Sequence, residues 1–103
     1  MKLFTIDTIP GQAFEALNTV KGTVVYSKNF GRDFMAGMKT LVGGEIAGYT
    51  EMLNEARQIA TKRMVDAAGA LGADAVVGLR YASSSVMQGA AEVIAYGTAV
   101  KFC

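Results

Sequence analysis

The glycine pair Gly43-Gly44 is the feature of this sequence most suited to binding a ligand. It immediately precedes a predicted helix, and the free backbone N–H groups at a helix N-terminus can hold an anion. Arg32 and Lys39 are the nearest cations that could assist. The pair is not a phosphate-binding P-loop, because no Lys-Ser or Lys-Thr pair follows it. The structural alternative is a plain turn between two helices at residues 42–45.

Carboxylates form a second candidate group. Glu51 and Glu55 are one helical turn apart on a predicted helix, and Asp33 and Glu45 lie nearby in the sequence. Hard cations prefer carboxylate and backbone oxygens as ligands, so one alternative function is a metal-ion-binding protein that uses such oxygens. The competing interpretation is a solvated helix face, with an acid in a first turn where the helix dipole favours it.

A hydrolytic enzyme is another alternative, and it would have to work without histidine, which this chain lacks. Asp33, Glu51 or Tyr49 would then act as acid or base with an activated water. Tyr49 could instead stack on a ligand held between subunits, or serve only in packing. Transition-metal sites need clusters of His and Cys, and the chain has a single cysteine, Cys103. The sequence therefore predicts no catalytic residue, no metal ligand set and no cofactor.

The composition is that of a folded protein. Of the 103 residues, 51% are hydrophobic and 18% are charged, which excludes a disordered chain and predicts one domain over residues 1–103. The net charge is only +1 and no run of Lys or Arg occurs, which argues against binding to nucleic acid. Asp7 and Pro10 interrupt the first apolar run, so no signal peptide is expected, and no stretch is long enough for a membrane helix. We expect a cytoplasmic protein without a membrane partner.

The hydrophobic pattern predicts two helices and four strands. The strongest signal is a helix that begins at residue 46 or 49 and ends at Leu71, with Gly72 as a left-handed cap. A short helix is expected over residues 31–41 and a hairpin loop over 84–89. The expected strands are 2–6, 15–26, 74–83 and 91–102. The order strand-strand-helix-helix-strand-strand favours an α+β fold in which an antiparallel sheet carries the long helix across one face.

Four glycines inside these elements carry predictions about packing. Gly22, Gly78 and Gly97 fall within predicted strands, where glycine marks a bulge or a close backbone contact. Gly69 falls inside the long helix, where it costs up to about 1 kcal/mol relative to alanine, so we expect a packing reason for it.

The apolar surface exceeds what one copy can cover. The last predicted strand has apolar residues on both faces, and one long helix covers only one face of a sheet. The other face needs the short helix or a second subunit. We expect self-association, with a monomer closed by the short helix as the alternative.

Several segments of this sequence resemble the YbjQ family of small prokaryotic proteins, and together they span nearly the whole chain. The resembling segments are RDFMAG at 32–37, VGG at 42–44, YTE at 49–51, EAR at 55–57, ALGADAVVG at 70–78 and YGTAV at 96–100. The resemblance implies α+β domains that assemble as ring-shaped homopentamers and that carry a heavy-metal-binding label. The family motif positions matched in this chain are Arg32, Asp33, Gly43, Gly44, Tyr49, Gly72, Asp74 and Gly78. The resemblance assigns no catalytic role to any of them, and the absence of His in this chain weakens the metal label.

The leading hypothesis is a non-enzymatic, cytoplasmic homopentamer that acts as a binding or scaffold module. Its only predicted partner is itself, and any site for a small ligand would lie between subunits. The candidate ligand-binding residues are Arg32, Asp33, Lys39, Gly43, Gly44 and Tyr49.

Overall fold

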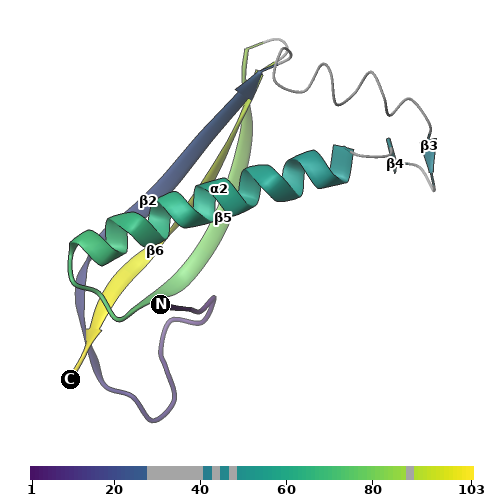
Figure 1. Ribbon diagram of the computed structural model, residues 1–103. Helices are drawn as coiled ribbons and strands as arrows, with labels where there is room; N and C mark the ends of the chain where they lie inside the picture. The colour runs from purple at the N-terminus through teal and green to yellow at the C-terminus, as the bar shows by residue number, and fades with distance from the viewer. Residues whose placement is uncertain (28–40, 43–44, 47–48, 88–89) are drawn as a thin grey trace.

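The computed structural model describes residues 1–27, 41–42, 45–46, 49–87 and 90–103 (Figure 1). These residues form one long helix on a four-stranded sheet, together with a separate pair of two-residue strands. The elements are β1 (Lys2–Leu3), β2 (Phe14–Ser27), β3 (Leu41–Val42), β4 (Glu45–Ile46), α2 (Tyr49–Ala70), β5 (Ala75–Met87) and β6 (Ala90–Phe102). The predicted α+β class is confirmed.

The large sheet is mixed, with strand order β1-β5-β6-β2. β6 lies between β5 and β2 and is antiparallel to both, as predicted. β1 is parallel to β5, with Lys2 opposite Ala75 and Leu3 opposite Val76. The expectation of a purely antiparallel sheet is therefore wrong at this edge, because the direction of a two-residue strand depends on how the chain returns to β2 and not on local pattern.

The hairpin between β5 and β6 is tighter than predicted. Residues 84–87 were expected in a loop, but they continue β5 and pair across to β6, with Ser84 opposite Glu92 and Ser85 opposite Ala91. Serine has little strand preference of its own, so the ladder with β6 determines its conformation here. Only residues 88–89, which lie outside the described residues, separate the two strands.

The short helix expected over 31–41 falls almost entirely outside the described residues. Its last expected residue, Leu41, belongs to β3 and not to a helix. Within the described ranges α2 is the only helix, so the expected two-helix arrangement is not what this part of the chain shows.

α2 begins at Tyr49 and ends at Ala70, close to the predicted limits, and crosses one face of the sheet obliquely (Figure 1). Its buried side chains repeat every four residues, so that they form one stripe along the helix. The stripe consists of Met52, Ala56, Ala60, Met64 and Ala68. Three of the five are alanines, which allow the helix backbone to approach the sheet closely.

Gly22 of β2 is where that approach is closest. A Cβ atom placed on Gly22 would lie 2.0 Å from the carbonyl oxygen of Ala60 and 2.3 Å from the amide nitrogen of Met64. The close contact predicted at Gly22 is confirmed. At Gly97 of β6 an added Cβ would lie 2.7 Å from a methyl carbon of Val76, so this prediction is confirmed as well.

The C-terminus of α2 closes as a Schellman motif. Gly72 has φ of 78°, its N–H donates to Gly69 at 3.0 Å, and the N–H of Ala73 donates to Ala68 at 3.1 Å. Gly72 is therefore the cap that the sequence predicts. Gly69 has no neighbouring atom within 4 Å of an added Cβ, so the expected packing reason for it is wrong.

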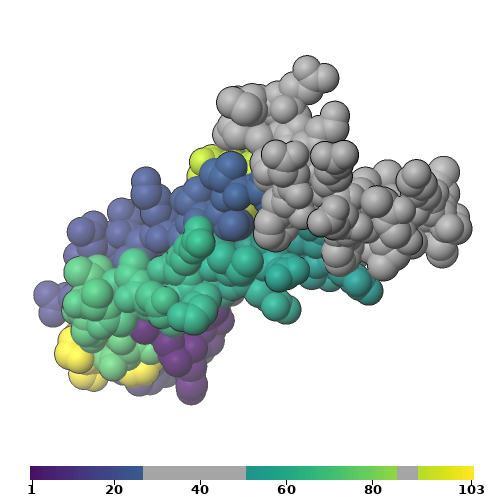
Figure 2. All heavy atoms as spheres, turned by 45° about the horizontal axis from the view of Figure 1, so that its top comes forward, coloured from purple at the N-terminus to yellow at the C-terminus, as the bar shows by residue number. Residues whose placement is uncertain are grey.

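On the face of the sheet opposite α2, the described residues form a packed layer near the chain termini. There Ala75, Val77 and Val100 form a second apolar cluster, and the side chains packed on it are Phe4, Ile9, Phe14 and Phe102. Figure 2 shows the N-terminal residues, in purple, below the C-terminal half of α2. Farther along the same face Val25 is 56% exposed and Tyr96 is 44% exposed. This part is called the open face below, and it is defined by Lys21, Val25 and Tyr96.

Candidate functional site

The residues that the sequence singles out lie mostly outside the described part of the chain. Arg32, Asp33, Lys39, Gly43 and Gly44 all fall in the gaps, so the anion site at the glycine pair remains a prediction. Among the predicted site residues Tyr49 alone is described, and it is the first residue of α2.

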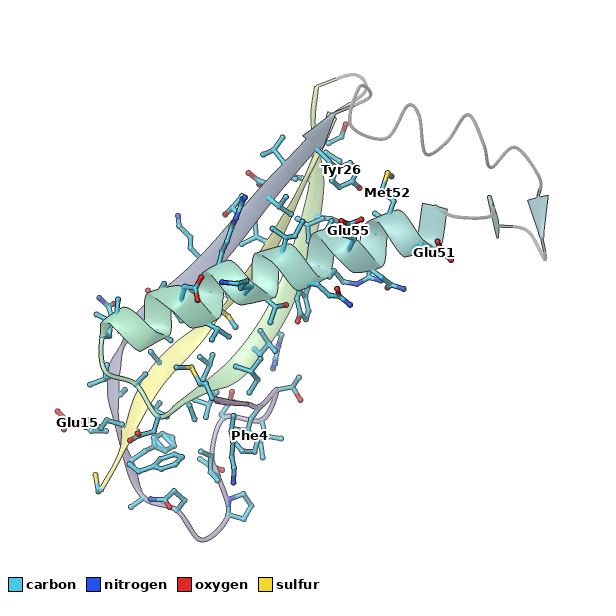
Figure 3. All side chains as sticks on the ribbon, viewed as in Figure 1. Phe4, Glu15, Tyr26, Glu51, Met52 and Glu55 are labelled. Atoms are coloured by element: carbon cyan, nitrogen blue, oxygen red, sulfur yellow. The ribbon has the colours of Figure 1, made fainter. Side chains whose placement is uncertain are left out.

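The predicted carboxylate pair lies on the N-terminal half of α2, where Figure 3 shows Glu51 and Glu55 on either side of the buried Met52. Both glutamates are exposed. Within the described ranges no group of three or more His, Cys, Asp or Glu side chains comes together. The carboxylate-metal alternative therefore gains no support from the described residues.

A groove with a volume of about 570 Å³ lies between α2 and β5. We call it the α2–β5 groove. It is lined by Asn54, Arg57, Gln58, Thr61, Lys62, Val65 and Tyr81. The six helical residues recur at spacings of three and four, so they share the helix face that borders β5.

A chain of hydrogen bonds joins the two walls of the α2–β5 groove. The Thr61 hydroxyl donates to the carbonyl oxygen of Arg57 at 2.7 Å, and it lies 2.7 Å from the phenol oxygen of Tyr81. Because the single Thr61 proton is used on Arg57, Tyr81 is the donor in the second bond. These bonds fix the Tyr81 ring against the helix.

The charges that line the α2–β5 groove are both positive. The Arg57 guanidinium donates one hydrogen bond to the side-chain oxygen of Asn54. Lys62 pairs with Asp66 at 2.9 Å, but both side chains are mostly exposed, so water screens this pair strongly. No carboxylate is among the lining residues. The groove therefore offers more donors than acceptors.

The second hollow lies on the open face and has a volume of about 440 Å³. Its lining residues are Thr19, Val20, Lys21, Gly78, Tyr96, Gly97 and Thr98. Lys21 is opposite Tyr96 in the β2–β6 ladder and is the only charged residue in this lining. Gly78 has φ of 65° at a bulge, and an added Cβ would lie 3.3 Å from Asp7 Oδ1. The Asp7 carboxylate therefore lies at the border of this hollow.

β5 is an edge strand beyond Leu79. Backbone bonds from Gly78 and Leu79 to the N-terminal segment are the last that the described residues show on the side away from β6, and from Arg80 to Ser84 no second described strand pairs with β5 on that side. Residues 81–87 include no charge and no proline, which are the usual means of preventing further strand pairing. This open edge borders the α2–β5 groove.

The opposite edge of the sheet, β2, is better protected. It carries the charged residues Glu15 and Lys21, and Arg63 from α2 donates to the carbonyl oxygen of Thr23 at 2.5 Å. The two edges of the sheet therefore differ in their capacity to accept another strand.

Sequence reasoning missed the α2–β5 groove. The polar stripe Asn54, Arg57, Gln58, Thr61 and Lys62 is visible in the sequence at helical spacing, and this was the available signal. Nothing local in the sequence places Tyr81 beside it.

In the described residues no helix is both long and apolar enough to span a membrane.

Comparison with known proteins places this fold among related chains. The YbjQ family model, described as "Putative heavy-metal-binding", matches residues 1–103. A UPF0145 protein of Clostridium novyi is 60% identical over 101 residues, which is 98% of each chain. A UPF0145 protein of Helicobacter hepaticus is 57% identical over 98% of this chain and 97% of its own length.

A solved structure shares the fold. The crystal structure of a protein of unknown function in the DUF74 family, from Pediococcus pentosaceus, aligns with a TM-score of 0.72. It covers 100% of this chain and 98% of its own, at 19% identity, so the likeness is one of fold.

The heavy-metal description does not fit the residues that the structure describes. Soft metal ions prefer sulfur and imidazole ligands. The full sequence has no His, and its one thiol, Cys103, is exposed at the end of β6. Within the described ranges no cluster of other candidate ligands replaces them.

Proposed function

The chain belongs to the YbjQ family, and from that premise we propose that it is a non-enzymatic binding or scaffold module that acts as a ring-shaped homopentamer. It works in the cytoplasm, and its small-ligand site lies between subunits. The number of subunits is the one that the family resemblance implies. The reason for assembly comes from this chain's own surface.

The open edge of β5 is the observation that carries the proposal. An edge strand without charge or proline is a template for another strand, and the segment from Tyr81 to Ser84 has this character. Because the β2 edge is occupied by charges and by Arg63, further pairing is directed to β5. A neighbouring copy that added a strand here would extend the sheet under α2.

The open face gives a second reason for a neighbour. Val25 and Tyr96 remain about half exposed on the face of the sheet away from α2. The two side chains lie four positions apart along the β2–β6 ladder, since Val25 is opposite Glu92 and Tyr96 is opposite Lys21. A second copy would cover them.

The two hollows lack the commonest acid–base groups, His, Asp and Glu, in their lining, and this favours a binding role. Neither hollow is lined by a carboxylate, and the chain supplies no histidine. General acid–base catalysis needs such groups within hydrogen-bond reach of a bound substrate.

Light scattering coupled to size-exclusion chromatography tests the assembly. Five copies of a 10.8 kDa chain give a particle of 54 kDa, and we expect this mass over a wide range of dilution. Ser83→Lys puts a charge on the open β5 edge and should lower the mass. Ala70→Lys, at an exposed position on the end of α2, is the matched control and should leave it unchanged. A single species of 10.8 kDa at every concentration would refute the proposal.

A further inference from the structure

We propose that the α2–β5 groove binds a small organic anion, in which a carboxylate or phosphate group is attached to a flat apolar body. The inference deepens the proposed binding function, on which it rests, by giving the class of ligand. The described lining comes from one copy and borders the β5 edge on which the proposed neighbour would dock, so the site lies at the interface, while binding and assembly are measured separately.

Charge selects an anion. Arg57 and Lys62 are the charged lining residues, and both are cationic. Asp66 neutralises part of Lys62, but it lies outside the lining and its pair with Lys62 is exposed to water. A guanidinium has five N–H donors, and within the described residues only the bond to Asn54 uses one. Arg57 therefore has donors left for a planar carboxylate or a phosphate.

The hydrogen-bond chain holds the groove ready for a ligand. Thr61 ties the Tyr81 phenol to the helix backbone, and Asn54 orients the Arg57 guanidinium. Side chains that already favour their bound arrangement lose less conformational entropy on binding. Both bonds are exposed to water, so they favour this position of Arg57 beside the ring without locking it.

The lining selects an apolar body beside the anionic group. Val65, the Tyr81 ring and the aliphatic stem of Lys62 provide carbon surface along the groove. Its volume of about 570 Å³ lies within the range typical of small-molecule sites, about 300–1,000 Å³. A flat ring fits such a surface better than a branched chain, because it can lie against the Tyr81 ring.

The hollow on the open face is the weaker candidate for the same ligand. Lys21 is its only charged lining residue, and the Asp7 carboxylate at its border repels an anion. Arg80, on the same face, already donates to the carbonyl oxygens of Thr5 and Leu79.

The test is an NMR titration of the full-length chain labelled with ¹⁵N. The probes are benzoate, phenyl phosphate, the uncharged benzyl alcohol and inorganic phosphate. We expect benzoate and phenyl phosphate to shift the amides of residues 54–65 and of Tyr81. Benzyl alcohol should bind at least about tenfold more weakly, since it cannot form a charge-assisted bond. The two charged aromatic probes distinguish a carboxylate ligand from a phosphate ligand.

Variants connect the binding to the groove. Arg57→Gln should lower the affinity for both charged aromatic probes by about tenfold or more. Arg57→Lys should lower it less, because lysine keeps the positive charge. Lys21→Gln removes the same charge from the open face and should leave binding unchanged. If Arg57→Gln unfolds the chain, the ratio of the affinities for benzoate and benzyl alcohol in the unaltered protein still decides whether the groove selects an anion.

Two results would overturn the inference. One is the absence of shifts in groove amides with either charged aromatic probe. The other is an equal loss of affinity in Arg57→Gln and Lys21→Gln. Light scattering on the same samples separates this outcome from failure of the assembly: a 54 kDa particle that binds no probe refutes the ligand class alone, and a monomer that binds benzoate refutes the ring alone.

Discussion

Replacing Gly22 by alanine should be one of the most damaging conservative changes in this protein. The added methyl group would point directly at the backbone of α2, where Ala60 and Met64 pass over β2. Neither obstacle is the flexible end of a side chain. The strain can therefore be relieved only by moving the helix or bending the strand.

The size of the effect follows from the distances. A real Cβ atom is essentially never closer than 3.0 Å to a neighbour, and here the distance would be 2.0 Å, so α2 must shift by about 1 Å or more. Overpacking of a core typically costs about 1–3 kcal/mol, and a displaced helix also loosens the stripe from Met52 to Ala68. We expect the free energy of unfolding to fall by about 2–4 kcal/mol.

Urea denaturation followed by circular dichroism measures this change, with all variants at equal protein concentration because association would shift the midpoint. Gly69→Ala is the matched control: it makes the same chemical change where nothing lies within 4 Å, and it should stabilise the protein by up to about 1 kcal/mol. A Gly22→Ala variant within about 0.5 kcal/mol of the unaltered protein would refute the packing argument.

Three further substitutions test other parts of the fold by the same denaturation assay. Gly72→Ala should destabilise the protein by about 1 kcal/mol, because φ of 78° disfavours any residue with a Cβ atom even though the space there is free. If stability did not fall, the cap would be unimportant. Asp74→Ala should cost about 1–2 kcal/mol because the carboxylate accepts the Phe102 N–H at 2.8 Å, whereas Asp74→Asn should cost less. Met64→Ala should cost about 2–5 kcal/mol, because this side chain is fully buried between α2 and the sheet. A smaller loss would indicate a loosely packed core.

The parts of the fold that sequence predicted well are those with local causes. The helix from Tyr49 follows from its periodic apolar residues, and its end follows from the left-handed preference of Gly72. Gly22 and Gly97 were correctly predicted to permit close contact, because glycine within a strand rarely has another reason.

The errors arise where distant segments determine the structure. Ser84 and Ser85 have the composition of a loop, but pairing with β6 makes them strand. The parallel pairing of β1 with β5 likewise depends on the path of the chain to β2 and not on a local pattern. Gly69 shows the opposite error: a residue that looks purposeful in sequence faces open space.

The candidate site was the least predictable part. The glycine pair at 43–44 is a local motif, and it lies outside the described residues. The α2–β5 groove depends on Arg57 of the helix meeting Tyr81 of a later strand, and no local pattern in either segment encodes that meeting. Sites built from two elements need the fold before they can be recognised.

The central position of β6 has a consequence for how the chain matures during translation. Among the described strands β2 pairs with β6 alone, and 62 residues lie between the end of one strand and the start of the other. At a synthesis rate of about 5–20 residues per second, β2 waits about 3–12 s after its own synthesis for this strand partner. α2 is synthesised within that interval, so a ribosome-bound nascent chain can shelter Val20 and Val24 beneath the helix before β2 gains its backbone hydrogen bonds.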